Sequence, residues 1–470
     1  MSGLYFQLQA GARALETHGK AVEIAGKNLA NINNPAYARQ RVIQGQVGHY
    51  YTGVGYEGMG VQAVAIRQSR DPLLDRQVMR ESSRTEALTA EQAMLQRGET
   101  SIGHSIDRSQ SSGFIDDNAQ SSAGGINAAM SDFFNAFESL AAKPTDVGIK
   151  QQLIARADLL SQRINDADTN LAQVQTDCTE QINQDLGKAN VILQRIADLN
   201  LQIGRVENGL PAGAVDLRDE RQSQLEDLAK IMDFEVRAKP DSEGQIQLVG
   251  RDSNNAEVLL VDGATKSGDV EFSVTNGFTY AGTAMNFHGG SIVGTYNAST
   301  GGIQDARDGL SALATQLRTS VNAAYDPSGT VQFFNTSSGL LSLNTAISVA
   351  TLRAGSGAFA GTNDRALAVG SVSTSVFSTT NSGYIDGTLS GHLAGVVSRL
   401  GSTLALTGTK VEDQTISEQM VREQRDATSG VSQDEELADM LKYQRAFQAS
   451  ARYVNVVDEL LDLVVNRLGV

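Results

Sequence analysis

Apolar residues recur every seven positions along the C-terminal tail, residues 434–470. The positions at this spacing are Met440, Phe447, Val454, Leu461 and Leu468. A heptad pattern of this kind predicts one long helix with a narrow apolar seam. Because a single helix cannot bury such a seam, we expect this helix to have a partner.

A second seven-residue repeat lies near the N-terminus, in a segment that reads as a helix from about residue 2 to residue 30. The repeat is formed by Leu8, Leu15, Val22 and Leu29. The simplest arrangement packs the two terminal helices together, so that the rest of the chain forms one long insertion between them. Two unrelated amphipathic helices on a globular core would give the same repeats, and the period alone leaves both arrangements open.

The interior of the chain alternates long helical segments with a β-rich insert. Helical periods predict helices over about residues 72–106, 148–206 and 216–232, with a possible break in the second near Gly187. A shorter helix between the first two has an apolar face formed by Phe133, Phe134, Phe137 and Leu140. After residue 233 the pattern alternates, as in strands, until about residue 290, and helices resume beyond it.

These patterns predict a mainly α fold with an inserted β-rich domain (α+β), in a nested arrangement of several domains. With 470 residues, the chain is too long for one compact core. We expect three domains: a terminal coiled-coil core, a filament-like domain of long helices and a small outer β domain. Their expected boundaries are 1–60 with 430–470, then 61–233 with 295–328 and 359–429, then 234–294 with 329–358.

A glycine-rich stretch, residues 45–60, contains Gly53, Gly55 and Gly58 at the spacing G-x-G-x-x-G. A dinucleotide site needs this motif between a buried strand and a helix. Here the stretch leads into an alternating segment, residues 61–66, so a β-hairpin is the better interpretation.

Composition and charge narrow the function classes. The formal net charge is −16 and the pI is about 4.8, which disfavours binding to a nucleic acid backbone. No apolar run has the length of a membrane span, so no membrane partner is expected. The N-terminus lacks the features of a cleaved secretion signal, which usually indicates a cytosolic protein but leaves open export by a route without cleavage.

No group of residues predicts catalysis, a cofactor or a metal site. The five histidines are scattered, and the single cysteine, Cys178, lies in a helical segment without a basic neighbour. Asp216, Asp219 and Glu220 stand at the start of a charged helix, where we interpret them as solvated carboxylates favoured by the helix dipole.

Residues 28–40, with the sequence NLANINNPAYARQ, resemble the N-terminal signature of the flagellar rod, hook and hook-associated proteins. The signature positions are Asn31, Asn33, Pro35, Tyr37, Arg39 and Gln40. Asn34 and Ala36 depart from the family pattern, which has Thr and Gly there. The segment from residue 429 to residue 452 resembles the C-terminal part of the same family.

Shorter matches at residues 216–219, 289–294 and 361–364 favour the members of this family that join hook to filament. The resemblance implies a structural protein, exported through the flagellar type III apparatus without a cleaved signal and located outside the cell. It implies an adapter ring at the hook tip on which the next hook-associated protein and the filament assemble. The implied partners are other copies of the chain, the hook protein, the next hook-associated protein and a cytoplasmic export chaperone that binds the C-terminal region.

We interpret the two heptad seams as the assembly surface, because the resemblance implies terminal segments that become ordered on assembly. Two other functions stay open at this point. The chain could be another flagellar axial protein of the rod or hook, or a cytosolic coiled-coil scaffold whose ends pair within one chain.

Overall fold

A computed structural model describes residues 2–51, 55–103, 125–208, 213–240, 242, 244–357 and 361–464. The chain divides into two compact units. The terminal unit comprises Met1–Glu86, Asp185–Gly290 and Asp413–Val470, and the central unit comprises Ala87–Gln184 and Ser291–Glu412. Three long helices, α2, α4 and α9, contribute residues to both units.

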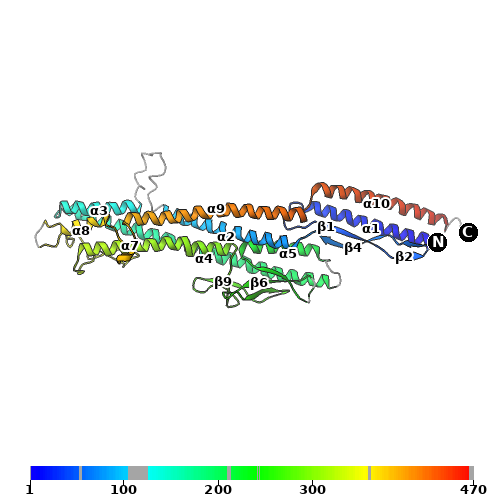
Figure 1. The fold of residues 1–470 in the computed structure, drawn as a ribbon, viewed down its shortest axis with the longest axis horizontal. Helices are drawn as coiled ribbons and strands as arrows, with labels where there is room; N and C mark the ends of the chain where they lie inside the picture. The colour runs from blue at the N-terminus through cyan, green and yellow to red at the C-terminus, as the bar shows by residue number, and fades with distance from the viewer. Residues whose placement is uncertain are drawn as a thin grey trace. The chain divides into compact units, whose positions relative to one another are not determined.

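Helices make up most of the described chain (Figure 1). The α-helices are α1 (Ser2–Ala30), α2 (Pro72–Gly103), α3 (Ile126–Ala142), α4 (Val147–Glu207), α5 (Val215–Ile231), α6 (Ser291–Ala298), α7 (Gln304–Tyr325), α8 (Asp364–Ser371), α9 (Leu389–Ser429) and α10 (Gln433–Asp462). A π-helical turn, Ser299–Ile303, joins α6 to α7, and short 3-10 turns follow at Val372–Thr374 and Thr379–Asn381. No described helix has both the length and the apolar character that crossing a membrane requires.

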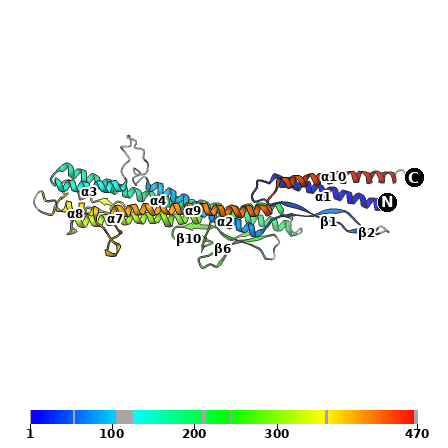
Figure 2. The ribbon, with the colours of Figure 1, turned by 45° about the horizontal axis from the view of Figure 1, so that its top comes forward.

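The strands form small antiparallel sheets, most of them in the terminal unit. The strands are β1 (Gln40–Gln46), β2 (His49–Tyr51), β3 (Tyr56–Gly58), β4 (Val61–Gln68), β5 (Glu235–Ala238), β6 (Ile246–Arg251), β7 (Glu257–Asp262), β8 (Thr265–Lys266), β9 (Val270–Ser273), β10 (Gly277–Tyr280), β11 (Thr283–Ala284), β12 (Phe334–Asn335) and β13 (Ser342–Leu343). The sheet orders are β1-β4, β2-β3, β5-β6-β7-β8 and β11-β10-β9, with β12-β13 in the central unit. The β1–β4 ribbon lies along α1 (Figure 2).

The central unit has an extensive apolar core. Side chains from α3, α4, α7, α8 and the first half of α9 meet in it. Phe133 of α3 lies at its centre, with ring centroids 5.2 Å from Phe134 and Phe137 and 5.4 Å from Phe334. The three phenylalanines of α3, together with Leu140, form the apolar face that the sequence predicts for this helix.

The structure confirms a mainly α fold with small β sheets, with the N- and C-terminal helices paired. It also confirms a hairpin in the glycine-rich stretch, where β2 pairs with β3. The possible break near Gly187 is wrong, because α4 is one continuous helix of 61 residues. A single glycine lowers helix propensity by only about 1 kcal/mol, and the apolar stripe of α4 continues on both sides of it. The three-domain division stays a prediction.

Candidate functional site

The two terminal helices, α1 and α10, lie side by side and run antiparallel (Figure 1). Three glycines of α1 receive three seam residues of α10. A Cβ at Gly11 would lie 2.7 Å from Val454 Cγ2, and one at Gly19 would lie 3.6 Å from the Phe447 ring. A Cβ at Gly26 would lie 3.9 Å from Met440 Cε. Only at Gly11 would a Cβ come too close to the partner helix; at Gly19 and Gly26 it would make an ordinary van der Waals contact.

The N-terminal seam is only partly covered by this pairing. Its four members, Leu8, Leu15, Val22 and Leu29, are all half-buried. The fully buried apolar positions of α1 are instead Ala21, Ile24 and Ala25. The α1–α10 contact thus uses small residues as much as the large ones in the seam.

The C-terminal seam faces α1, yet it also remains partly accessible. Met440, Val454 and Leu461 are half-buried, and Phe447 is 41% exposed. Val457, three positions after Val454, is 2% exposed. Leu468 lies outside the described residues.

Beside the seam, α10 carries a second apolar row, which starts at Tyr453, a residue whose ring still lies against Gly11 of α1. Its members Tyr453, Val456, Leu460 and Leu463 are between 41% and 53% exposed. They follow one another at spacings of three or four residues, so they share one face of the helix. We call these four residues the outer row.

A buried polar cluster joins the start of α10 to the segment that follows α1. Arg39 donates through Nε to Glu436 and through Nη1 to Glu435, and its Nη2 lies 3.5 Å from Asp439. The backbone N–H of Arg39 donates to the carbonyl of Ser429, the last residue of α9. Arg39 is 7% exposed and Glu436 is 2% exposed, so this ion pair is shielded from water.

Asn28 of α1 organises the centre of the same cluster. Its Nδ2 donates to Glu436 Oε2 and to the carbonyl of Gln40, both at 2.9 Å. Its Oδ1 accepts from Tyr37 Oη at 2.8 Å and from the backbone N–H of Gln40 at 3.0 Å. The amide thus satisfies buried groups from three parts of the chain, as burial of polar groups requires.

Asp219 of α5 closes the cluster on its other side. Its carboxylate accepts from Arg70 Nη2 at 2.8 Å and from Gln40 Nε2 at 3.3 Å. Arg70 also donates to the carbonyl of Ala36 at 2.6 Å. We call the whole set the clasp: Asn28, Tyr37, Arg39, Gln40, Arg70, Asp219, Glu435 and Glu436.

Burial dominates the electrostatics of the clasp. It raises the pKa of the Asp219 carboxyl above its usual value, although Arg70 acts in the opposite direction. Burial, together with nearby carboxylates, also raises the pKa of the Tyr37 hydroxyl. At the exposed edge, partial burial is outweighed by hydrogen bonds from Lys27 and Gln40, which lower the pKa of Asp216. The clasp is therefore a set of mutually satisfied groups that holds chain segments together.

Comparisons with known proteins show what this chain is similar to. Residues 113–331 match the family model described as the flagellar hook-associated protein FlgK helical domain. Residues 423–468, which include α10 and its joint with α9, match the flagellar basal body rod FlgEFG protein C-terminal model. The chain is 24% identical over 532 aligned residues to flagellar hook-associated protein 1 of Bacillus subtilis, covering 100% of this chain and 99% of that relative.

Along its whole length, the chain is similar to flagellar hook-associated protein 1, a structural protein of the flagellum. A relative with the same name from Escherichia coli is 24% identical over 238 residues, which is 50% of this chain and 40% of that protein. The solved flagellar hook junction protein FlgK from Burkholderia pseudomallei superposes with a TM-score of 0.42 at 18% identity, over 55% of this chain and 46% of that one.

The family signature contributes to the clasp unevenly. Tyr37, Arg39 and Gln40 are buried at its centre. Asn31 donates from Nδ2 to the carbonyl of Lys27 at 2.9 Å, at the end of α1. Asn33 and Pro35 are exposed in the turn that follows. For these last two positions the structure gives no contact that explains the signature.

Sequence reasoning missed several residues of the clasp. The interpretation of Asp219 as a solvated carboxylate is wrong, because its side chain is buried against Arg70 and Gln40. Asn28 begins the stretch that resembles the family signature, but the sequence did not predict its buried hydrogen bonds. Glu436 gave no signal, because acidic residues are common in the first turn of any helix.

Proposed function

We propose that this chain joins the hook to the filament of the bacterial flagellum, as an adapter ring at the hook tip. Copies of the chain contact the hook protein on one side. The next hook-associated protein, and then the filament, assemble on the other side. Similarity along the whole chain supports this proposal, since the relative that matches it from end to end carries the name flagellar hook-associated protein 1.

One structural observation supports assembly through the terminal helices. After α1 and α10 have paired, the outer row of α10 still leaves four large apolar side chains exposed. Exposed apolar surface of this kind marks protein interaction sites, because its removal from water stabilises an interface. The seam residues Phe447 and Leu461 are also incompletely covered, so neighbouring copies would complete their burial.

The same surface is suited to a cytoplasmic export chaperone. A chaperone that covers the outer row and the seam would keep the chain from associating before export. Export through the flagellar type III apparatus, followed by a location outside the cell at the hook–filament junction, completes the proposal.

A pair of double variants tests the proposal. Val456→Asp with Leu460→Asp changes the outer row, and Val454→Asp with Leu461→Asp changes the seam. Each places charges in a surface that assembly would bury, which costs several kcal/mol, and we expect filament-bearing hooks to fall by about tenfold or more. Electron microscopy of hooks, with immunodetection of flagellin released into the medium, measures the loss.

The matched control is Gln448→Asp with Asn455→Asp, which adds the same charges at exposed polar positions of α10. It should support filaments at the normal frequency. Normal filaments on hooks that carry the outer-row or seam variant would refute assembly through α10.

A cytosolic scaffold remains the second candidate, because pairing of α1 with α10 within one chain is what that function would use. Fractionation separates the two functions. A chain found only in the cytoplasm, with filaments unaffected by its deletion, would favour the scaffold.

A further inference from the structure

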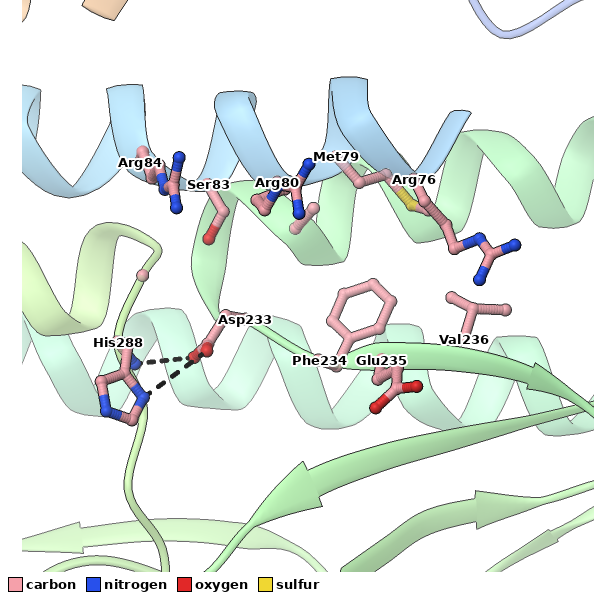
Figure 3. Close-up of a pocket in the computed structure, with 12 residues that line it drawn as sticks. Arg76, Met79, Arg80, Ser83, Arg84, Asp233, Phe234, Glu235, Val236 and His288 are labelled. Carbon is pink, nitrogen blue, oxygen red and sulfur yellow. Dashed lines mark hydrogen bonds and ion pairs between the residues drawn. The ribbon is translucent and has the colours of Figure 1, made fainter. Parts of the chain in front are cut away.

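The terminal unit contains a groove that neither the clasp nor the outer row uses. It lies between α2 and the segment that leads from α5 into β5, and it has a volume of about 410 Å³ (Figure 3). Arg76, Arg80 and Arg84 of α2 form one wall, and Phe234 and Val236 lie on the opposite side.

The arginine wall is regular and accessible. Its three residues are four positions apart, so they share one face of α2. The side chains of Arg80 and Arg84 are 60% and 56% exposed. Among the described residues their carboxylate contact is Glu81 of the same helix, which both share. The wall therefore has more positive than negative charge.

The acidic groups across the groove are engaged elsewhere. Glu235 pairs with Arg237 and with Arg251 within the sheet. Asp233 accepts a hydrogen bond from the backbone N–H of His288 at 2.9 Å. We call Met79, Phe234 and Val236 the apolar floor of the groove; Met79 is 7% exposed. The groove thus combines a cationic wall with an apolar floor, which suits a partner that carries both acidic and large apolar side chains.

A surface of that composition lies on α9 of the same unit. Asp413, Ile416, Met420 and Glu423 are spaced three, four and three residues apart, so they form one row along the helix. Ile416 is 58% exposed and Met420 is 59% exposed. Neither Asp413 nor Glu423 forms an ion pair within the described part of the chain. We call these four residues the α9 ridge.

The ridge is turned away from the helix that carries the groove. α9 contacts α2 through other residues: Gln414 donates to Glu81 at 2.8 Å, and Arg422 Nη2 lies 3.4 Å from Ser82 Oγ. These two positions lie on the opposite side of α9 from the ridge, by the helical period. The ridge of one copy therefore cannot enter its own groove.

We propose that the α9 ridge of one copy docks into the arginine groove of the next. Acidic ends of the ridge would meet the arginine wall, while Ile416 and Met420 would cover the apolar floor. Because the two surfaces differ, the contact is heterologous, and repeating it gives a ring or a helical row. This inference rests on the proposed function, and it names the contact between neighbouring copies within the ring.

Disulfide trapping in assembled flagella tests the contact. Two differently tagged full-length copies, Arg80→Cys and Met420→Cys, are produced together in the bacterium from which the chromosomal copy has been removed. Flagella are isolated and oxidised. We expect a mixed dimer, since a disulfide forms only when the two Cα atoms come within about 7 Å. The native Cys178 is buried and is present in every sample.

The control replaces Arg80→Cys with Arg205→Cys, an exposed arginine of α4 in the same unit. This pair should give at least about tenfold less mixed dimer. A charge exchange adds a second readout: Arg76→Glu with Arg80→Glu should reduce filament-bearing hooks, and adding Asp413→Lys with Glu423→Lys should restore them.

The outcomes separate this inference from the function on which it rests. If the chain is present in isolated flagella without a mixed dimer above the control, the ridge–groove contact is refuted and the junction function stands. A dimer formed mainly between two Met420→Cys copies would also refute it, because it would indicate a symmetric contact. Absence of the chain from flagella would overturn the proposed function and this inference together.

Discussion

The core of the central unit and the α1–α10 pair of the terminal unit are both helical, and they differ in how much of their apolar surface they bury. In the central unit, α3 buries nine of its residues, and Phe133, Phe137 and Leu140 are 0% exposed. In α10, which is 30 residues long, the buried positions are Glu436 and Val457.

This difference indicates two sources of stability. The central unit removes its own apolar surface from water, so its helices are stable within one chain. The α1–α10 pair is held by a few buried apolar residues, among them Ile24 and Val457, and by the clasp at one end. Its remaining apolar surface is available to stabilise contacts with other molecules. The following predictions test that contrast, from the largest expected effect to the smallest.

Truncation of one phenylalanine in each region should lower the free energy of unfolding by very different amounts. Phe133→Ala removes a fully buried ring and should lower the free energy of unfolding of the central unit by about 3–5 kcal/mol. Phe447→Ala removes a ring that packs on Gly19 and is 41% exposed. It should lower the free energy of unfolding by about 1 kcal/mol. Denaturant unfolding followed by hydrogen exchange in each region measures both. Equal losses would contradict the contrast.

Removal of Arg39 tests whether the clasp holds the terminal pair. Arg39→Met leaves the carboxylate of Glu436 buried without its cation, which should cost about 3 kcal/mol or more and speed hydrogen exchange in α10. Arg445→Met, at an exposed position of α10, is the control and should change stability by less than about 0.5 kcal/mol.

The double variant Arg39→Met with Glu436→Met separates loss of charge pairing from loss of packing. It should recover much of the stability, since two apolar side chains replace a buried ion pair. If Arg39→Met itself left the exchange of α10 unchanged, the clasp would have no part in holding the helix.

Acid should affect one carboxylate in each unit in opposite directions. In the central unit, hydrogen bonds from Ser328 and Val331 lower the pKa of Asp326 to about 2. Its contribution to stability is present above its unfolded pKa, near 3.9, and is lost as the pH falls through about 2. In the terminal unit, burial raises the pKa of Asp219, so its contribution is present at low pH and is lost as the pH rises through its folded pKa.

Calorimetry of the Asp326→Asn variant checks this smallest effect. The difference in unfolding temperature between the unchanged chain and Asp326→Asn should shrink as the pH falls from about 5 to about 2. The same comparison with Asp219→Asn should not shrink over that interval. A constant difference for Asp326→Asn would mean that its carboxylate is not held ionised by its neighbours.

The sequence by itself was enough for the helices and for the place of the β-rich insert, whereas it left the pairing of the chain ends as one of two possible arrangements. Heptad spacing in α1 and α10 and the apolar face of α3 reflect the period of a helix, which is a local property of the chain. The family signature could also be recognised from the sequence, because its residues lie within one short stretch of the chain. What the sequence could not reveal was the partner of each signature residue.

Only the tertiary structure decided those partners. Arg39 meets Glu436 across 397 positions of chain, and Gln40 meets Asp219 across 179. Gly11 and Gly19 of α1 lie against Val454 and Phe447 of α10. A helical period fixes which side chains share a face, but the packing of one face against another depends on shapes and charges that distant segments supply. For that reason the sequence determined the helices of the terminal pair, and the fold determined the clasp that holds them.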